Sequence, residues 1–103
     1  MDKIVLQKIC ELTRKGQPLA VVTIISTKGS TPRKAGVVML VESDGKIWGT
    51  VGGGCGESDV RQRALLAMDE NISCIHKVEL LNDMAADDGM VCGGIMDFFI
   101  QVL

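Results

Sequence analysis

The chain has 103 residues, a formal net charge of −2, 47% hydrophobic residues and 23% charged residues. A chain this long makes one domain, 1–103, and folding would bury about two-thirds of its unfolded surface, enough for one core. The composition excludes a disordered chain, and no apolar run approaches the ~20 residues of a membrane-spanning helix. The chain has no surplus of basic residues and few aromatic residues, so nothing in its composition indicates nucleic-acid binding. The chain begins without a secretory-signal pattern, so we expect a cytoplasmic protein with no membrane partner.

The first predicted element is a helix over residues 3–15. Its apolar residues recur at i, i+4 and i+7, which places them on one helical face. Asp2 is the expected N-cap, and Gly16 is expected to end the helix in the left-handed conformation. The residues of the apolar face are Val5, Ile9 and Leu12.

Three strands are predicted next, over residues 19–25, 37–42 and 47–51. The first is a β-branched apolar run, typical of a strand central in a sheet. The second and third are separated by Asp44-Gly45, the signal of a tight hairpin turn.

The second half of the chain predicts a helix over 57–69, a strand over 73–80 and a last strand over 95–103. We expect Val60, Ala64, Ala67 and Met68 to form the buried stripe of this helix. The predicted fold is therefore α/β: a mixed β-sheet of about five strands packed with two helices, in the order α-β-β-β-α-β-loop-β.

A triple-glycine loop, residues 52–54, is the most informative motif. It leads from a strand into a helix start, where free N–H groups and the helix dipole favour an anion such as phosphate. Neither the Rossmann nor the P-loop glycine pattern fits it. Cys55 follows, and a thiol at a helix start suits a nucleophile, a persulfide carrier or a soft metal ligand. The alternatives are a tight turn and a small buried cysteine.

A second loop, residues 83–94, combines three carboxylates with Cys92, Gly93 and Gly94. Carboxylate oxygen and thiol sulfur prefer different metal ions, so a solvated acidic loop is the favoured interpretation on spacing alone.

A third loop contains Ser30, Thr31, Arg33 and Lys34, which could hold a phosphate or pyrophosphate. The alternative is an ordinary basic surface turn. We expect His76, the only histidine, to be structural or exposed rather than catalytic. The remaining sulfur-containing side chains are expected in the core: Cys10, Cys74, Met39, Met68 and Met96.

Three segments, 29–36, 49–57 and 83–94, resemble the signatures of the XdhC/CoxI (CoxF) family, the maturation factors of xanthine dehydrogenase and CO dehydrogenase. The resemblance extends over about 17–103. It implies that the protein binds the molybdenum cofactor, a pterin with a dithiolene and a phosphate, with or without an attached nucleotide. It also implies that the protein helps to sulfurate this cofactor and delivers it. The implied partners are a molybdenum hydroxylase apo-enzyme and a cysteine desulfurase.

The same resemblance implies which residues form the site. Cys55 and Cys92 would lie at the cofactor, in contact with its molybdenum or sulfido ligand, and the flanking loops would form the walls. The wall residues are Ser30, Thr31, Arg33, Gly52, Gly53, Gly54, Gly93 and Gly94. Gly56 departs from the family pattern, where a larger aliphatic residue is usual. Longer members continue into a Rossmann-type domain, which we expect to be absent here.

Two other functions remain open from the sequence. Cys55 or Cys92 could carry a persulfide in sulfur transfer, or the chain could be a docking or regulatory subunit for a two-domain partner. The chain is more readily explained as a cofactor chaperone than as an enzyme, since no convincing general base accompanies the thiols. We also expect a homodimer, because the last strand would offer an unpaired edge.

Overall fold

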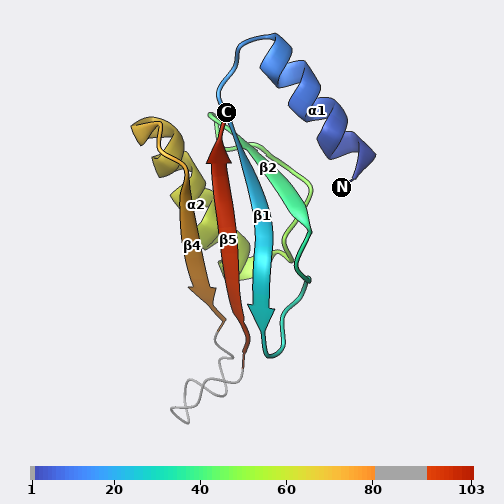
Figure 1. Cartoon of the computed structure of the whole chain (residues 1–103), viewed down its shortest axis with the longest axis vertical. Helices are drawn as coiled ribbons and strands as arrows, with labels where there is room; N and C mark the ends of the chain where they lie inside the picture. Colours follow the sequence, from blue (N-terminus) through green and yellow to red (C-terminus); the bar gives the residue numbers. More distant parts are fainter. Residues whose placement is uncertain (1, 81–92) are drawn as a thin grey trace.

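The computed structural model describes residues 2–80 and 93–103. The elements follow the predicted order (Figure 1). They are α1 (Lys3–Arg14), β1 (Leu19–Lys28), β2 (Val38–Glu42), β3 (Ile47–Trp48), α2 (Gly54–Glu70), β4 (Cys74–Glu79) and β5 (Ile95–Val102). Fold class, strand number and helix number are confirmed.

The five strands form one sheet in the order β3-β2-β1-β5-β4, and every neighbouring pair is antiparallel. The expectation of a mixed sheet is therefore wrong. Parallel neighbours need a crossover connection. Within residues 2–80 and 93–103, the one helix that connects two strands is α2, and it joins β3 to β4, which lie at opposite edges of the sheet.

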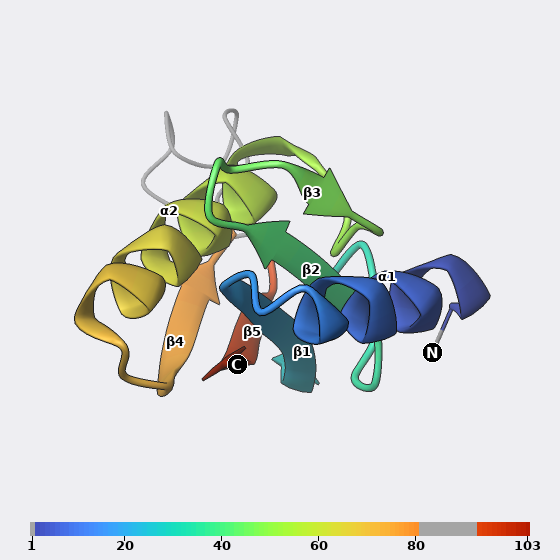
Figure 2. The ribbon, with the colours of Figure 1, turned by 90° about the horizontal axis from the view of Figure 1, so that it is seen from above.

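The sheet separates two apolar cores, because successive side chains of a strand point to opposite faces. One core, beneath α2, contains Val22 of β1 and Phe98 of β5. The other, beneath α1, contains Leu19 and Val21 of the same β1. Figure 2 shows α2 over one face and α1 on the other side, near β1 and β2. Strand β1 is thus buried on both faces and central, as predicted.

Helix α1 begins and ends as its sequence predicts. Oδ1 of Asp2 accepts a hydrogen bond from the N–H of Ile4 at 2.8 Å. After the C-cap, Gly16 adopts φ 70°, which a residue without Cβ reaches at little cost. The expectation that Cys10 is a core residue is wrong, since it is exposed. Cys10 lies beside the buried face of the helix, whose buried residues are Val5 and Leu12.

Two boundaries in the middle of the chain differ from expectation. Strand β3 ends at Trp48 rather than Val51, because Gly49 adopts φ 84° and takes the backbone out of the strand conformation. Helix α2 begins at Gly54 rather than Glu57. Glycines are poor helix formers, but here they supply the positive φ angles that bring the chain into the helix.

One face of the sheet is only half covered. Beyond α1, over β4 and β5, Ile75 is 68% exposed and Phe99 is 37% exposed, and the two are register partners. The predicted reason for a homodimer is wrong, because β5 lies between β1 and β4 and is not an edge. Among the described residues, no helix has the length and apolar character needed to cross a membrane.

Candidate functional site

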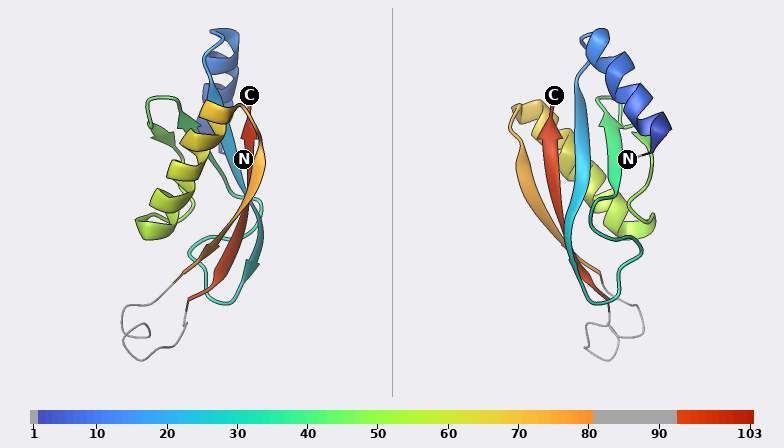
Figure 3. Two further views of the ribbon diagram at one scale, coloured as in Figure 1. Left: turned by 90° about the vertical axis from the view of Figure 1, so that its left-hand side faces the viewer. Right: turned by 45° about the vertical axis from the view of Figure 1, so that its right-hand side comes forward.

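The described parts of the three motif segments, which for the third are Gly93 and Gly94, meet at one end of the molecule. A Cβ on Gly52 would collide with the ring of Pro32, and a Cβ on Gly94 would lie 2.5 Å from the carbonyl oxygen of Ser30. Leu80, directly after β4, joins this cluster, and its side chain packs against Gly56. Figure 3 shows the loop after β1, the start of α2 and the end of β4 gathered at the same end of the sheet. The tertiary structure thus brings together loops that lie far apart in the sequence.

The triple-glycine loop has a backbone that L-residues with side chains rarely adopt. Gly52, Gly53 and Gly54 have φ angles of 126°, 75° and 67°. At Gly52, the contact with Pro32 excludes a side chain as well. Gly53 is the N-cap of α2 and has no side chain to cap the helix. The N–H groups of the loop therefore need hydrogen-bond acceptors from residues other than the N-cap.

Glu57 supplies them. Its Oε1 accepts hydrogen bonds from Oγ1 of Thr50 at 2.6 Å and from the N–H groups of Val51 at 3.1 Å and Gly53 at 3.3 Å. The N–H of Gly52 donates to Oγ1 of Thr50 at 3.0 Å. The prediction that the glycine loop leaves free N–H groups for an anion is therefore wrong at Gly52 and Gly53, whose N–H groups, like that of Val51, donate to side-chain oxygens of the protein itself.

Cys55 is exposed in the first turn of α2. It lines a cavity of about 530 Å³ between the start of α2 and the end of β4. The other residues around this cavity are Gly53, Gly56, Asp59, Val78, Glu79 and Leu80. A solvent-accessible thiol beside a concave surface can contact a ligand, which a buried structural cysteine cannot.

Asp59 lies one helical turn after Cys55 and contacts His76. Its Oδ1 lies 3.2 Å from Nε2 of His76 on β4. The His76 side chain is 24% exposed and Asp59 is 53% exposed. The pair connects α2 to the edge strand of the sheet and places a carboxylate on the rim of the cavity.

In the loop of Ser30, Thr31 and Arg33, the described hydrogen bonds are local. Oγ1 of Thr31 donates to the carbonyl of Arg33 at 2.9 Å, and the Arg33 guanidinium donates to the carbonyl of Pro32 at 3.0 Å. Arg33 itself is exposed. The loop therefore keeps a cation at the surface, next to the triple-glycine loop that Pro32 contacts.

The glycines of the second loop have a packing role. A Cβ on Gly93 would collide with the carbonyl group of Leu80, and one on Gly94 would meet the carbonyl of Lys28. The N–H of Leu80 donates to the carbonyl of Gly94 at 2.9 Å. Cys92 and the acidic residues 83–88 lie outside the described residues.

A metal site formed within the described residues finds no support. In the ranges 2–80 and 93–103, no group of three or more His, Cys, Asp or Glu side chains is arranged to hold a metal ion.

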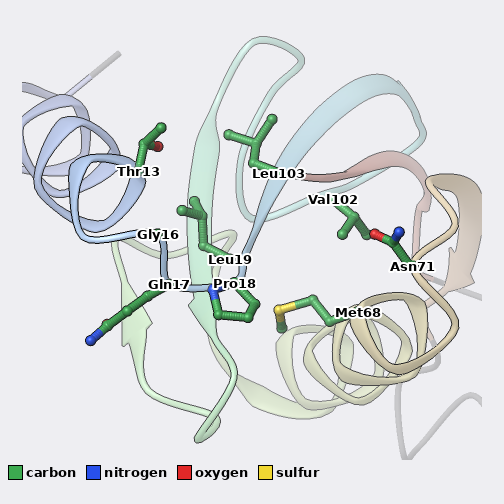
Figure 4. Close-up of a pocket in the computed structure, with 9 residues that line it drawn as sticks. All are labelled: Thr13, Gly16, Gln17, Pro18, Leu19, Met68, Asn71, Val102 and Leu103. Atoms are coloured by element: carbon green, nitrogen blue, oxygen red, sulfur yellow. The ribbon is translucent and has the colours of Figure 1, made fainter.

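A second cavity, of about 400 Å³, lies at the opposite end of the molecule (Figure 4). It is formed between the turn after α1, the end of α2 and the chain terminus, and its lining includes Pro18, Met68, Asn71 and Leu103. None of the described residues that line it carries a thiol or belongs to a motif segment, so it is separate from the candidate site.

Sequence patterns mark Glu57 and Asp59 only as acidic residues that suit the first turn of a helix. Their partners explain why sequence reasoning misses their roles. Glu57 turns back to Thr50, seven residues earlier, and Asp59 contacts His76 on another element. The loop geometry and the crossing of α2 over β4 decide these contacts, and no local pattern encodes either.

Comparisons with known proteins agree on one family. A model of the XdhC and CoxI family matches residues 12–79. The protein YqeB of Escherichia coli is 37% identical over 92 residues, which are 89% of this chain and 17% of YqeB. A protein of Bacillus subtilis described as a probable xanthine dehydrogenase subunit is 36% identical over 72% of this chain and 23% of its own length.

A solved structure shares the fold. The crystal structure of a xanthine dehydrogenase from Bacillus halodurans superposes with a TM-score of 0.74 at 26% identity, covering 94% of this chain and 30% of that chain. The chain thus spans less than a third of the length of each of these three relatives.

Proposed function

Because the chain belongs to the XdhC and CoxI family, a family linked to xanthine dehydrogenase, we propose that it binds the molybdenum cofactor as cargo. It would hold the cofactor, assist its sulfuration and deliver it to an apo-enzyme of the xanthine dehydrogenase or CO dehydrogenase type. One observation carries the proposal: the exposed thiol of Cys55 lies beside a cavity of about 530 Å³ where the motif loops meet.

The chemistry of the cavity residues suits the parts of this cargo. A thiol is a soft ligand, which suits molybdenum and its sulfur ligands. The pterin ring carries N–H donors, and the carboxylates of Asp59 and Glu79 on the cavity rim can accept hydrogen bonds from them. The cofactor phosphate would be repelled by these carboxylates, so we place it towards the exposed Arg33.

A pterin assay tests this function. The protein is purified anaerobically from a host that makes the cofactor, and bound pterin is oxidised to its fluorescent form and quantified against protein. We expect Cys55→Ser to lose pterin by about tenfold or more. Cys10→Ser is the matched control, because Cys10 is also exposed but lies on α1. Equal pterin in wild type and Cys55→Ser would reject the site. Cys92→Ser tests the second motif thiol in the same assay.

The exposure of Cys55 also favours a second candidate function, sulfur transfer. The Cys55 thiolate would attack the outer sulfur of a persulfide on a cysteine desulfurase. A new S–S bond forms on Cys55, and the desulfurase leaves as its thiolate. Intact-mass measurement after incubation with desulfurase and free cysteine should show the added mass of one sulfur atom. The adduct should be missing in Cys55→Ser, and its presence there would assign it to another thiol.

The proposed partners are therefore a molybdenum hydroxylase apo-enzyme and a cysteine desulfurase. We also propose a homodimer, for which the support is the half-covered sheet face with exposed Ile75 and Phe99. Light scattering should give the mass of two chains for the wild type and of one chain for Ile75→Glu. A wild-type mass of one chain would reject the dimer.

A further inference from the structure

We propose that Glu57 is a positioning residue: its carboxylate holds the triple-glycine loop in the place of an external anion and thereby fixes Cys55. The inference rests on the proposed function in one respect, that Cys55 faces the ligand. It concerns a residue that the cofactor need not touch, and it predicts how the site keeps its shape before any ligand arrives.

The first argument is how the loop is held. Residues 51–53 lie outside any strand or helix, and within the described part of the chain their N–H groups donate to two acceptors, Oε1 of Glu57 and Oγ1 of Thr50. Thr50 is itself held by Glu57, to which its hydroxyl donates. One carboxylate oxygen therefore organises the whole turn. Charge-assisted hydrogen bonds of this kind are about twice as strong as neutral ones.

The second argument is that the glycine backbone needs such a restraint. Successive positive φ angles at Gly52, Gly53 and Gly54 are accessible to glycine, but glycine is also the residue that loses most conformational freedom on ordering. Cys55 directly follows this run, and it is exposed, so few packing contacts restrain its position. The restraint comes from Glu57, which lies two positions after Cys55 in the helix and accepts a hydrogen bond from the N–H of Gly53.

The third argument concerns the ligand. An anionic group that entered the loop at Val51 to Gly53 would have to displace the Glu57 carboxylate, at the cost of its three hydrogen bonds. The N–H groups of residues 51–53 therefore do not serve as a phosphate cradle. The ligand is left with the thiol of Cys55 and the cavity between α2 and β4, while its anionic part binds outside the loop.

The substitution Glu57→Gln separates position from charge. All three hydrogen bonds end on one oxygen, Oε1, so the single carbonyl oxygen of glutamine can accept them without the negative charge. Glu57→Ala removes both the oxygen and the charge. Comparison of the two variants therefore shows whether the hydrogen bonds or the charge matter.

The experiment measures the rate of alkylation of Cys55 by iodoacetamide between pH 6 and 9 in the folded protein, with each thiol followed by peptide mass analysis. Cys10 is the reference within the same chain, because it is exposed and lies on α1. We expect the ratio of the Cys55 rate to the Cys10 rate at neutral pH to fall about tenfold in Glu57→Ala, the size expected from the loss of one or two hydrogen bonds. In Glu57→Gln the ratio should stay at or above the wild-type value.

Three outcomes would overturn the inference. An equal increase of the ratio in both variants would mean that Glu57 acts only through its charge. An unchanged ratio in both, with a lowered thermal midpoint, would mean a general structural role. An unchanged ratio and an unchanged midpoint would mean that the carboxylate holds nothing. The assay needs no cofactor, so its result stands apart from the pterin assay, and failure of one is distinguishable from failure of the other.

Discussion

The two helices of this protein begin in opposite ways. Helix α1 has a side-chain N-cap, Asp2, which accepts a hydrogen bond from the N–H of Ile4. Helix α2 has Gly53 as its N-cap and no side-chain cap, and its loop is held by Glu57 from inside the helix. The first arrangement is local and spans two residues. The second needs a run of glycines, a reaching carboxylate and a neighbouring loop at Pro32.

The difference shows what each helix start is for. A conventional cap satisfies the first N–H groups and closes the helix end. At α2 the glycine run takes the place of such a cap, and the start of the helix becomes part of a concave surface that includes Cys55. The start of α1 is closed by a local cap, whereas the start of α2 leaves the exposed Cys55 beside a cavity, and the proposed function would use that surface to contact the ligand.

The strongest destabilisation should come from a substitution at Gly52, and Gly16 is its control. Gly52→Ala places a Cβ against Pro32 at φ 126°, whereas Gly16→Ala at φ 70° meets open space. We expect Gly52→Ala to lower the free energy of unfolding by about 3 kcal/mol, from strain and overpacking. Gly16→Ala should lower it by about 1 kcal/mol, from the left-handed backbone alone. Urea denaturation measures both. Equal losses would mean that the contact with Pro32 does not limit the loop.

The N-cap of α1 should have a more modest effect. Asp2→Ala removes the hydrogen bond to the N–H of Ile4, and we expect a loss of about 1 kcal/mol in the free energy of unfolding. Asp2→Asn keeps the acceptor oxygen and should retain most of the stability. Urea denaturation of both variants is the measurement. The alkylation rate of Cys55 should not change in either, and a change there would show that the two helix starts are coupled.

The weakest response is expected at Glu11 of α1. Hydrogen bonds from Lys8 and Lys15, together with their positive charges, hold the pKa of the Glu11 carboxyl below its ordinary value of 4.5. A carboxyl with a lowered pKa in the folded state stabilises the fold above its unfolded pKa, and this stabilisation is lost as the pH falls through the folded value. Glu11→Gln should therefore lower the thermal midpoint slightly at pH 7 and not at pH 3. An equal difference at both pH values would contradict the ion-pair origin.

Much of the fold could be predicted because it depends on patterns among residues that are close in the sequence. The apolar stripe of α1, its cap at Asp2 and its end at Gly16 are confirmed, as is the hairpin at Asp44 and Gly45, where Asp44 accepts from the N–H of Lys46. These features depend on residues a few positions apart. Two of the wrong expectations, the mixed sheet and the edge position of the last strand, concern which strands are neighbours, and neighbour choice depends on the whole chain.

The candidate site divides in the same way. The residue types, with their glycine-rich loops and thiols, and the family to which these motifs belong can be read from the amino-acid order alone. Three features come only from the packed chain: Pro32 contacts Gly52, Leu80 lines the cavity beside Cys55, and Glu57 accepts hydrogen bonds from the loop. The cause is the range of the interactions. Backbone preferences and periodicity act within one helical turn or one strand, whereas contacts between loops depend on how helix and sheet pack, which no local pattern encodes.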